Sequence, residues 1–586
     1  MQPASGATTR VIGSGQSHSP DPPACRRSDV ASMFLDRLGD QTVGLRTREA
    51  RWTWDQVVRE AARRGALGAA RMVDGPKHVG ILLDNVPEFA FWLGGAALTG
   101  ATIVGINPTR DDVTMADEIR HTDCQLIVTD TAGAARLAGL DTGVAQGNIL
   151  NIDDQDYQRL LPAEADPHQL AADSGDLEGS LYLLLFTSGT TGRSKAVKCT
   201  QRRLAMVSYA AIDKFGHRPD DVDYCCMPMF HGNALMALWF PALANGATIC
   251  QTPKFSASGF LGDIRFFGAT FFTYVGKAVA HVLATPAAPD DLDNTLERGF
   301  GTEASPEDQA RFAERFGAVL AEGYGSSEGG VMADKAPDAP EGALGRPLPG
   351  VAIVDPDTGE DRAVARLDEN GLVSNADEAI GEMVDKYASA KFEGYYKNDA
   401  ADAERLRGGW YWSGDLGYID EAGFLYFAGR QGDWVRVDSE NTSTLVTERV
   451  IRRHRGILAA AAFGVPDPRS GDLLMAAIEV ADPAAFDAAE FAAFLNAQPD
   501  LGRKGAPRLV RISSALPMTG SNKVIKTQLQ QQGWDTSDRI IGWFGRPPAA
   551  YTEFDAAARQ RLVDDFAAHG RARFLHQQSR ALHQQS

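Results

Sequence analysis

The stretch HVGILLDNVPEFAFWLGGAALTGATIVGINP, residues 78–108, decides the fold. Its apolar run at 78–83 predicts a buried strand, residues 87–99 predict an apolar helix, and the β-branched run at 101–106 predicts a second strand. Strands that alternate with helices at this spacing form βαβ units with parallel pairing. The stretch therefore predicts an α/β domain built on a parallel sheet.

The same alternation continues on both sides of this stretch. Thr53 and Gln56 form a capping-box start for a helix that runs past Arg64. A polar helix at 111–121 and a strand at 125–129 follow. The acidic, weakly patterned residues 132–179 are expected at the surface, and an apolar strand is expected at 181–186. A doubly wound α/β sheet is the predicted fold class.

Length and charge narrow the class of protein. A chain of 586 residues is too long for one hydrophobic core, so at least two domains are expected. The excess of 77 acidic over 58 basic residues gives a net charge of -19, which disfavours nucleic acid but permits single phosphorylated ligands. Two uncharged stretches, 89–109 and 231–253, have the length of a membrane span, but Gly, Asn and Pro interrupt both. They fit buried elements of a soluble domain better.

Cysteine usage and the first residues indicate the compartment. The six cysteines form no CxxC pair and no His/Cys cluster with metal spacing, which favours a reducing, cytoplasmic location. Residues 1–29 are polar and lack the apolar core of a signal peptide, so a disordered leader is expected there.

The loop TSGTTGRSK, residues 187–195, carries the clearest chemistry in the chain. It follows the predicted strand at 181–186, where α/β sheets bind ligands. Its hydroxyl donors, glycines and one cation suit a polyphosphate. It is not a Walker A loop, because Ser194 precedes Lys195 and Ala196 follows it. The alternative is a flexible surface turn.

This loop resembles the signature of the adenylate-forming (acyl-CoA synthetase, AMP-binding) superfamily, and further motifs of that family follow in order. They are MPMFHG (227–232), EGYGSSEG (322–329), YWSGD (411–415), GRQGD (429–433) and PMTGSNK (517–523). The resemblance covers residues 45–530 or so. Within the superfamily, residues 432–444 look most like the fatty acid transport proteins, or very-long-chain acyl-CoA synthetases.

The resemblance implies a fatty acid:CoA ligase that uses ATP, Mg²⁺ and coenzyme A. A long- or very-long-chain fatty acid would react with ATP to acyl-AMP and pyrophosphate, and then form acyl-CoA. It also implies an N-terminal AMP-binding domain at 30–429, a small mobile α+β lid at 430–530 and a C-terminal extension at 531–586. Any membrane contact would be peripheral, at the inner face, and driven by the lipid substrate.

The resemblance also assigns roles to individual residues. The phosphates of ATP would be held by Thr187, Ser188, Gly189, Thr190, Thr191, Gly192 and Lys195. The adenine and α-phosphate would contact Gly301, Thr302, Glu303, Tyr324, Gly325, Ser326 and Ser327. Asp415, helped by Arg430, would accept the ribose hydroxyls. Glu328 would ligate Mg²⁺, and Lys523 would bridge the acid's carboxylate and the nucleotide.

Some residues keep two interpretations. His231 either borders the acyl site as a catalytic residue or is a satisfied core histidine. The aromatic group either lines an acyl channel or packs in the core: Phe266, Phe267, Phe271, Phe272 and Tyr274. Asp438 and Ser439 replace a Lys-Gly pair near the expected path of coenzyme A. The alternatives are therefore a fatty acyl-AMP ligase that loads a carrier protein, and a non-catalytic acyl-binding or transport-associated homologue.

Overall fold

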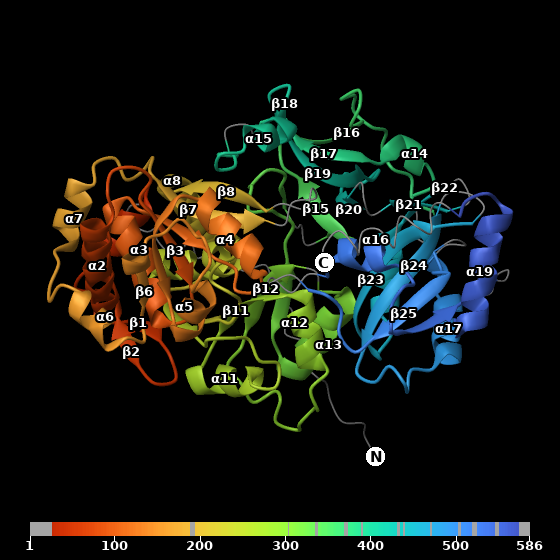
Figure 1. The fold of residues 1–586 in the computed structure, drawn as a ribbon, viewed down its shortest axis with the longest axis horizontal. Coiled ribbons are helices and arrows are strands. Elements are labelled where there is room, and N and C mark those ends of the chain that lie inside the picture. The colour runs from red at the N-terminus through yellow and green to blue at the C-terminus, as the bar shows by residue number, and fades with distance from the viewer. Residues whose placement is uncertain are drawn as a thin grey trace, which may run out of the picture.

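The computed structural model places a large N-terminal α/β part, an antiparallel sheet and a smaller C-terminal part in chain order (Figure 1). The residues that it describes are 26–187, 194–302, 304–334, 338–340, 342–368, 373–387, 391–430, 434–437, 440–468, 472–501, 505–518, 524–544 and 550–572. The first 25 residues of the expected leader lie outside these ranges. Of the remainder, Asp29 caps helix α1 (Val30–Leu35) by accepting from the Ser32 backbone.

The stretch at residues 78–108 forms the centre of a six-stranded sheet. The strands, in spatial order, are β6 (Ile149–Asn151), β5 (Cys124–Thr129), β3 (His78–Leu82), β4 (Thr102–Gly105), β7 (Leu181–Thr187) and β8 (Lys195–Thr200). Every neighbouring pair is parallel except β7 with β8. The predicted parallel α/β sheet is confirmed.

The helices around this sheet follow the sequence pattern closely. Helix α2 (Trp54–Arg71) begins with the predicted capping box at Thr53, and helix α3 spans Pro87–Thr99. Helix α4 (Asp112–His121) is capped by Asp111. Residues 132–179, which were expected only to lie at the surface, contain several regular elements. They are α5 (Thr131–Leu137), η1 (Gln146–Asn148), β6, α6 (Gln155–Leu160) and α7 (Pro167–Asp173).

A second, seven-stranded sheet carries the C-terminal ends on which the site is built. Its spatial order is β13 (Val319–Glu322), β12 (Arg298–Thr302), β11 (Phe271–Val275), β9 (Val222–Cys225), β10 (Thr248–Gln251), β1 (Val43–Arg46) and β2 (Arg51–Thr53). Only β2 pairs antiparallel. The associated helices are α8 (Gln201–Phe215), α9 (Gly232–Ala234), the π-helix η2 (Leu235–Trp239), α10 (Phe240–Asn245), α11 (Phe260–Phe267), α12 (Gly276–Leu283) and α13 (Pro306–Phe316).

The uncharged stretches and the aromatic group both lie in the core of this part. The stretch at 89–109 holds α3 and β4, and the stretch at 231–253 runs from α9 to β10. None of the helices in the described ranges is long and apolar enough to cross a membrane. In the aromatic group Phe267, Phe271, Phe272 and Tyr274 are buried and belong to one hydrophobic cluster, so core packing accounts for them. Phe266 alone is exposed.

A third, antiparallel sheet lies at the top of Figure 1. Its strands are β14 (Ala333–Asp334), β15 (Ala343–Pro347), β20 (Leu425–Arg430), β19 (Trp410–Ile419), β17 (Gly381–Asp385) and β16 (Val351–Val354), with β18 (Leu406–Arg407) paired to β19. Helices α14 (Ala376–Ala379) and α15 (Asp399–Arg405) lie between its strands in the chain.

The C-terminal part has a five-stranded sheet of its own. The strands are β23 (Ile457–Pro466), β24 (Asp472–Val480), β25 (Leu509–Ser513), β26 (Arg539–Gly542) and β27 (Thr552–Glu553). A hairpin of β21 (Trp434–Val437) and β22 (Glu440–Ser443) precedes it, and the helices are α16 (Thr444–Arg452), α17 (Ala488–Asn496), η5 (Pro499–Leu501), α18 (Lys526–Gln532) and α19 (Ala556–Ala568). Asp555 caps α19, whose Leu562 and Phe566 pack in the same cluster as Trp534.

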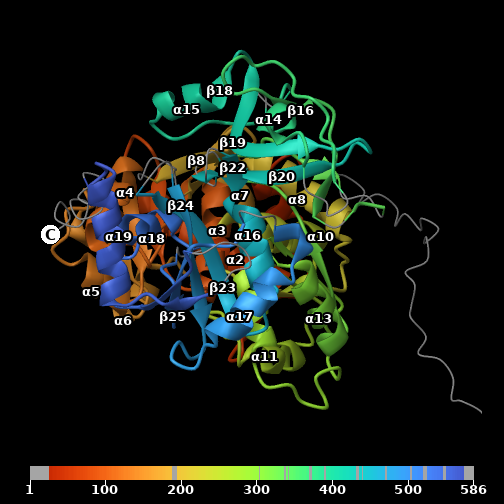
Figure 2. The same ribbon diagram turned by 90° about the vertical axis from the view of Figure 1, so that its right-hand side faces the viewer.

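Ion pairs join the C-terminal part to the large part. Figure 1 shows the C-terminal part, in blue, beside α12 and α13, and Figure 2 shows it beside α13. Lys277 Nζ on α12 lies 3.1 Å from Glu479 Oε2 on β24, and Arg453 Nε lies 3.0 Å from Glu307 Oε1 on α13. Burial, reinforced by the Lys277 charge, lowers the pKa of the neighbouring His281. The ammonium of Lys277 is therefore the main positive charge facing Glu479 from α12.

Candidate active site

The sequence motifs meet at the carboxyl ends of the parallel strands. Strand β7 ends at Thr187, β12 ends at Thr302, and β13 ends at Glu322, two residues before Tyr324. In open α/β sheets this edge is where ligands bind, because loops and backbone donors converge there. Motifs far apart in the chain are thus brought to one edge of the fold.

The phosphate loop is described at its two ends. Thr187 and Lys195 are paired in register across β7 and β8, and the Thr187 hydroxyl donates to the Lys195 carbonyl over 3.5 Å. Ser188, Gly189, Thr190, Thr191 and Gly192 lie outside the described residues. The Lys195 side chain is buried, with Nζ 3.2 Å from Glu404 Oε2 and 5.3 Å from the centre of the Tyr395 ring. The loop therefore ends on a cation that already faces other polar side chains of the site.

Tyr324 and Asp415 are in direct contact. The Tyr324 hydroxyl donates to Asp415 Oδ2 over 2.6 Å. Asp415 lies on β19, and its backbone pairs in register with Arg430, the last residue of β20. Of Arg430 the structure describes the backbone alone. The expected adenine-stacking residue and the expected ribose acceptor thus lie side by side.

Glu328 is buried and fits the part of a metal ligand. Its Oε1 accepts a hydrogen bond of 3.0 Å from the Tyr395 hydroxyl. Tyr395 also lies beneath the Lys195 ammonium, so the phosphate-loop lysine and Glu328 share one neighbour. A carboxylate is a hard oxygen donor of the kind that Mg²⁺ prefers. The donor set at Glu328 therefore suits Mg²⁺.

Two further segments with expected site roles are the run from Gly301 to Glu303 and the MPMFHG segment at 227–232. A Cβ on Gly301 would collide with the ring and carbonyl of Tyr274, so no other residue fits there. Thr302 follows it, and Glu303 lies outside the described residues. A Cβ added to Gly232, the residue after His231, would lie 3.3 Å from Ser327 Oγ. Gly232 therefore lies beside Ser327.

The cleft between these residues is narrow. Its volume is about 40 Å³, and it is lined by Tyr324, Ser326, Glu328, Val331, Arg405, Tyr411, Ser413 and Asp415. Pockets that hold small ligands enclose roughly 300–1,000 Å³. The cleft, with Tyr324 and Asp415 hydrogen-bonded across it, is therefore smaller than a ligand-sized pocket.

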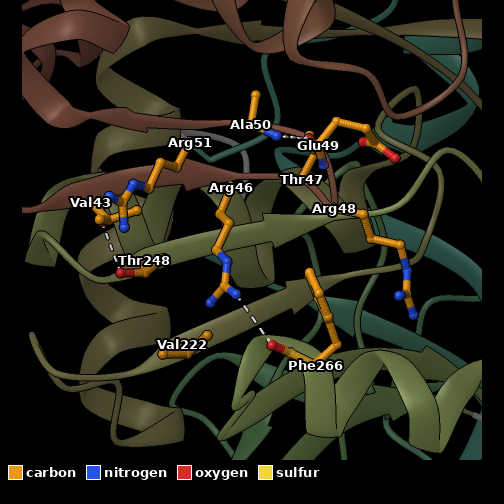
Figure 3. Close-up of a pocket in the computed structure, with 10 residues that line it drawn as sticks. All are labelled: Val43, Arg46, Thr47, Arg48, Glu49, Ala50, Arg51, Val222, Thr248 and Phe266. Carbon is orange, nitrogen blue, oxygen red and sulfur yellow. Dashed lines mark hydrogen bonds between the residues drawn. The ribbon is translucent and has the colours of Figure 1, made fainter.

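A larger pocket, of about 470 Å³, lies elsewhere (Figure 3). Its lining includes Val222 and Thr248, the first residues of β9 and β10, so it opens at the amino ends of the strands. Arg46 in this pocket already donates to the carbonyl of Phe266 over 3.2 Å, and Arg48 Nε donates to Asp263 over 3.0 Å. The pocket therefore lies at the opposite edge of the sheet from the carboxyl ends of the strands, where α/β sheets bind ligands.

Sequence reasoning missed several residues of the cleft. Tyr395 contacts Glu328 and Arg405 lines the cleft, yet neither stands in a motif. Tyr411 and Ser413 also line it; they stand in the YWSGD element, but the sequence assigned them no role. The aromatic-glycine run from 392 to 396 and the arginine before the Tyr-Trp-Ser-Gly-Asp element were the available signals. Three features of the sequence lie outside the described residues: Lys523, Gly432 and Asp433 of the GRQGD motif, and the pair Asp438 and Ser439.

Solved structures share this fold over most of the chain. The ATP-bound MatB of Rhodopseudomonas palustris superposes with a TM-score of 0.69 at 21% identity, covering 86% of this chain and 98% of that one. The anthranilate CoA ligase AuaEII in complex with anthranoyl-AMP superposes with a TM-score of 0.72 at 20% identity, covering 86% of this chain and 96% of that one. At these identities the likeness shows the fold: a large N-terminal domain and a small C-terminal domain.

Sequence relatives define the family. The AMP-binding enzyme family matches residues 34–395, and the AMP-binding enzyme C-terminal domain matches residues 447–523. The steroid-22-oyl-CoA synthetase of Rhodococcus jostii is 62% identical over 94% of this chain and 99% of that protein. The medium/long-chain-fatty-acid–CoA ligase FadD17 of Mycobacterium tuberculosis is 44% identical over 82% of this chain and 90% of that protein. The chain belongs to the AMP-binding enzyme family and is an ATP-dependent acyl-CoA ligase, with ATP, Mg²⁺ and coenzyme A as its cofactors and co-substrates.

Proposed function

We propose that the acid activated by this ligase is a steroid whose side chain ends in a carboxyl group at carbon 22. The observation that carries the proposal is the 62% identity to steroid-22-oyl-CoA synthetase over 94% of the chain. At this identity, over nearly all of both chains, the walls of the acyl site are expected to be largely shared. The proposal replaces the long- or very-long-chain fatty acid that was expected from the sequence.

A medium- or long-chain fatty acid is the second candidate. The FadD17 ligases of Mycobacterium marinum and Mycobacterium tuberculosis are 41% and 44% identical to this chain. Both proteins are named for such acids, but their identity to this chain is lower and their coverage shorter than that of the steroid enzyme. Direct competition between the two classes of acid therefore decides the substrate.

The chain's residues suit the adenylation step. A carboxylate is a poor electrophile, so it first attacks the α-phosphate of ATP, which gives acyl-AMP and releases pyrophosphate. Phosphoryl transfer of this kind depends on positioning and on charge neutralisation. Lys195 and the hydroxyls of its loop would bind the β- and γ-phosphates, Asp415 would accept the ribose hydroxyls, and Lys523 would bridge acid and nucleotide. Coenzyme A then takes the acyl group as a thioester and AMP leaves.

Glu328 would hold Mg²⁺ in this site. The metal, when bound, supplies positive charge to the phosphate oxygens of ATP. The part of the protein is to keep the Glu328 carboxylate oriented, which the Tyr395 hydroxyl does from 3.0 Å. Lys195, on the other side of Tyr395, supplies a second positive charge.

Domain motion and location are also proposals. The large domain would span 30–429, the lid 430–530 and the extension 531–586, with the lid rotating between the two half-reactions. Strands β26 and β27 of the extension pair into the sheet of the lid, so extension and lid would move together. Peripheral contact with the inner membrane face would follow from a lipid substrate.

The substrate proposal is tested by acid-dependent pyrophosphate exchange followed by thioester formation. A steroid C22 acid and a graded series of fatty acids are supplied separately and then in competition. We expect the steroid acid to give the highest kcat/KM, because specificity is expressed in that ratio. Higher kcat/KM with a C8 to C18 fatty acid would replace the proposal by the second candidate. Exchange without thioester on adding coenzyme A would indicate the acyl-AMP ligase alternative.

The ion pair between the two parts gives a prediction about the half-reactions. Glu479 Oε2 accepts from the Leu516 backbone over 3.0 Å, at the start of the segment that carries Lys523, and pairs with Lys277 on α12. Lys277→Met leaves a buried carboxylate without its cation, which destabilises this contact. We expect at least a tenfold loss in pyrophosphate exchange, and a smaller loss in thioester formation from supplied acyl-adenylate.

The control is Lys254→Met, which removes an exposed lysine of the same domain. Its Nζ pairs with Asp84 at 3.3 Å, but its side chain is 77% exposed. Exposed pairs contribute little, so both half-reactions should stay at the wild-type rate. Equal losses in the two half-reactions of Lys277→Met would argue against a role for this pair in placing the lysine segment.

A further inference from the structure

Arg405 is a cation inside the nucleotide cleft that none of the motifs includes. Among the described residues that line the cleft, two are carboxylates, Glu328 and Asp415, and Arg405 is the single basic one. ATP is a polyanion and the whole chain carries a net charge of -19. A phosphate entering this cleft therefore meets repulsion from two carboxylates, and Arg405 opposes it from within the wall.

The Arg405 guanidinium is fixed along one edge. Its Nε donates to the Tyr395 hydroxyl over 3.3 Å, and its Nη1 donates to the Trp412 carbonyl over 3.2 Å. A Cβ on Gly414 would collide with Nη1, and Gly414 has a φ of 72°, so the Ser-Gly-Asp element leaves room for this arginine. Arg405 is thus held against the element that carries Asp415.

The other edge of the guanidinium remains available. An arginine has five N–H donors, and the two bonds above use one on Nε and one on Nη1. Within the described ranges, no hydrogen bond or ion pair of Nη2 is found. Burial opposes the charge, but Tyr411, Tyr395 and Glu328 together raise the pKa of Arg405 above its ordinary value. The free edge is therefore cationic and has the forked geometry that suits phosphate oxygens.

Arg405 is also connected to the proposed metal ligand. Tyr395 accepts from Arg405 and donates to Glu328 Oε1, so the three side chains form one chain of hydrogen bonds. An acceptor bond from a cation makes the Tyr395 hydroxyl a better donor to the carboxylate. The fixed edge of Arg405 hence orients Glu328 through Tyr395.

We propose that Arg405 is a nucleotide-binding residue: its free edge binds a phosphate oxygen of ATP and of the acyl-adenylate, while its fixed edge holds Tyr395 against Glu328. The inference rests on the proposed placement of ATP in this cleft. It adds a cation to the set of Lys195, Arg430 and Lys523 that the sequence motifs supply.

The test compares ligands with and without phosphate. The affinities of ATP, AMP and adenosine are measured by calorimetry for wild type, Arg405→Met and Arg405→Lys. We expect Arg405→Met to weaken ATP and AMP at least tenfold and to leave adenosine unchanged. Arg405→Lys should recover part of the loss, because it keeps the charge and loses the fork. Equal weakening of adenosine and ATP, or no weakening of ATP, would overturn the proposal.

Arg407→Met is the matched control. Arg407 lies two residues further along, pairs with Glu382 at 3.1 Å and stacks over the Trp412 ring, and it does not line the cleft. We expect its affinities to equal those of wild type, and the thermal unfolding curves of all variants are compared to detect misfolding. An unchanged affinity of Tyr324→Ala for adenosine and ATP would show that both bind away from Tyr324. The proposed placement of ATP would then be wrong, independently of the role of Arg405.

Discussion

Replacing Glu328 by glutamine is expected to abolish most of the adenylation activity while leaving the fold intact. Glutamine keeps the size of the side chain and a carbonyl oxygen that can accept from Tyr395, but it lacks the charge that Mg²⁺ requires. We expect pyrophosphate exchange to fall by a factor on the order of a hundred to a thousand, the range seen when one charge-stabilising group is removed. The apparent Mg²⁺ requirement should rise in the same variant.

The measurement is a Mg²⁺ titration of pyrophosphate exchange at saturating ATP. Glu178→Gln, at an exposed residue that pairs with Arg202 at 3.4 Å, serves as the control and should titrate like wild type. If Glu328→Gln reached wild-type exchange at wild-type Mg²⁺ concentrations, Glu328 would not be a metal ligand. The buried contact with Tyr395 would then be structural.

Asp415→Ala should weaken ATP binding at least about a hundredfold. The carboxylate is expected to accept two ribose hydroxyls, and each hydrogen bond to a charged group contributes about 1.5–3 kcal/mol. The Tyr324 hydroxyl, which donates to Asp415 Oδ2 over 2.6 Å, would also lose its partner. Affinity is measured by calorimetry with ATP and with 2′,3′-dideoxy-ATP.

Comparing the two nucleotides distinguishes the loss of a ribose contact from a general disruption of the cleft. Wild type should bind ATP much more tightly than its dideoxy analogue, whereas Asp415→Ala should bind both equally, because coupled groups lose their interaction together. Asp361→Ala, at an exposed carboxylate that pairs with Lys386, should keep the wild-type preference. A preference retained by Asp415→Ala would place the ribose elsewhere.

Local signals made most of the N-terminal fold predictable. Helix α3 spans the predicted residues because Pro87 begins it and Gly100, with a φ of 63°, ends it. Helix α2 carries both hydrogen bonds of its capping box. Strand β6 was missed because it has three residues, too few for a period to show. Its pairing with β5 is set by the tertiary fold.

The site could be predicted only where residues stand in compact motifs. Tyr395 and Lys195 are 200 positions apart, and the contact between them depends on the tertiary fold, which pairs Tyr395 with Val197 of β8 in an antiparallel bridge. Arg405 belongs to no motif, and only the helix that ends on it and the strand that follows bring it into the cleft. The aromatic group around β11 shows the opposite problem. Its sequence allowed either an acyl channel or a packed core, and only the structure shows that its buried members lie in the core.

Strands β26 and β27 extend the C-terminal sheet beyond the end of the family match. The family match stops at residue 523, but β26 pairs with β25 from Ile512 to Leu509, and β27 pairs with β26 in turn. A chain cut at the end of the match would expose the backbone donors and acceptors of β25, an apolar strand, as a free edge. Such edges recruit other strands and promote aggregation. Any shortened form of this protein should therefore retain the residues up to the end of α19.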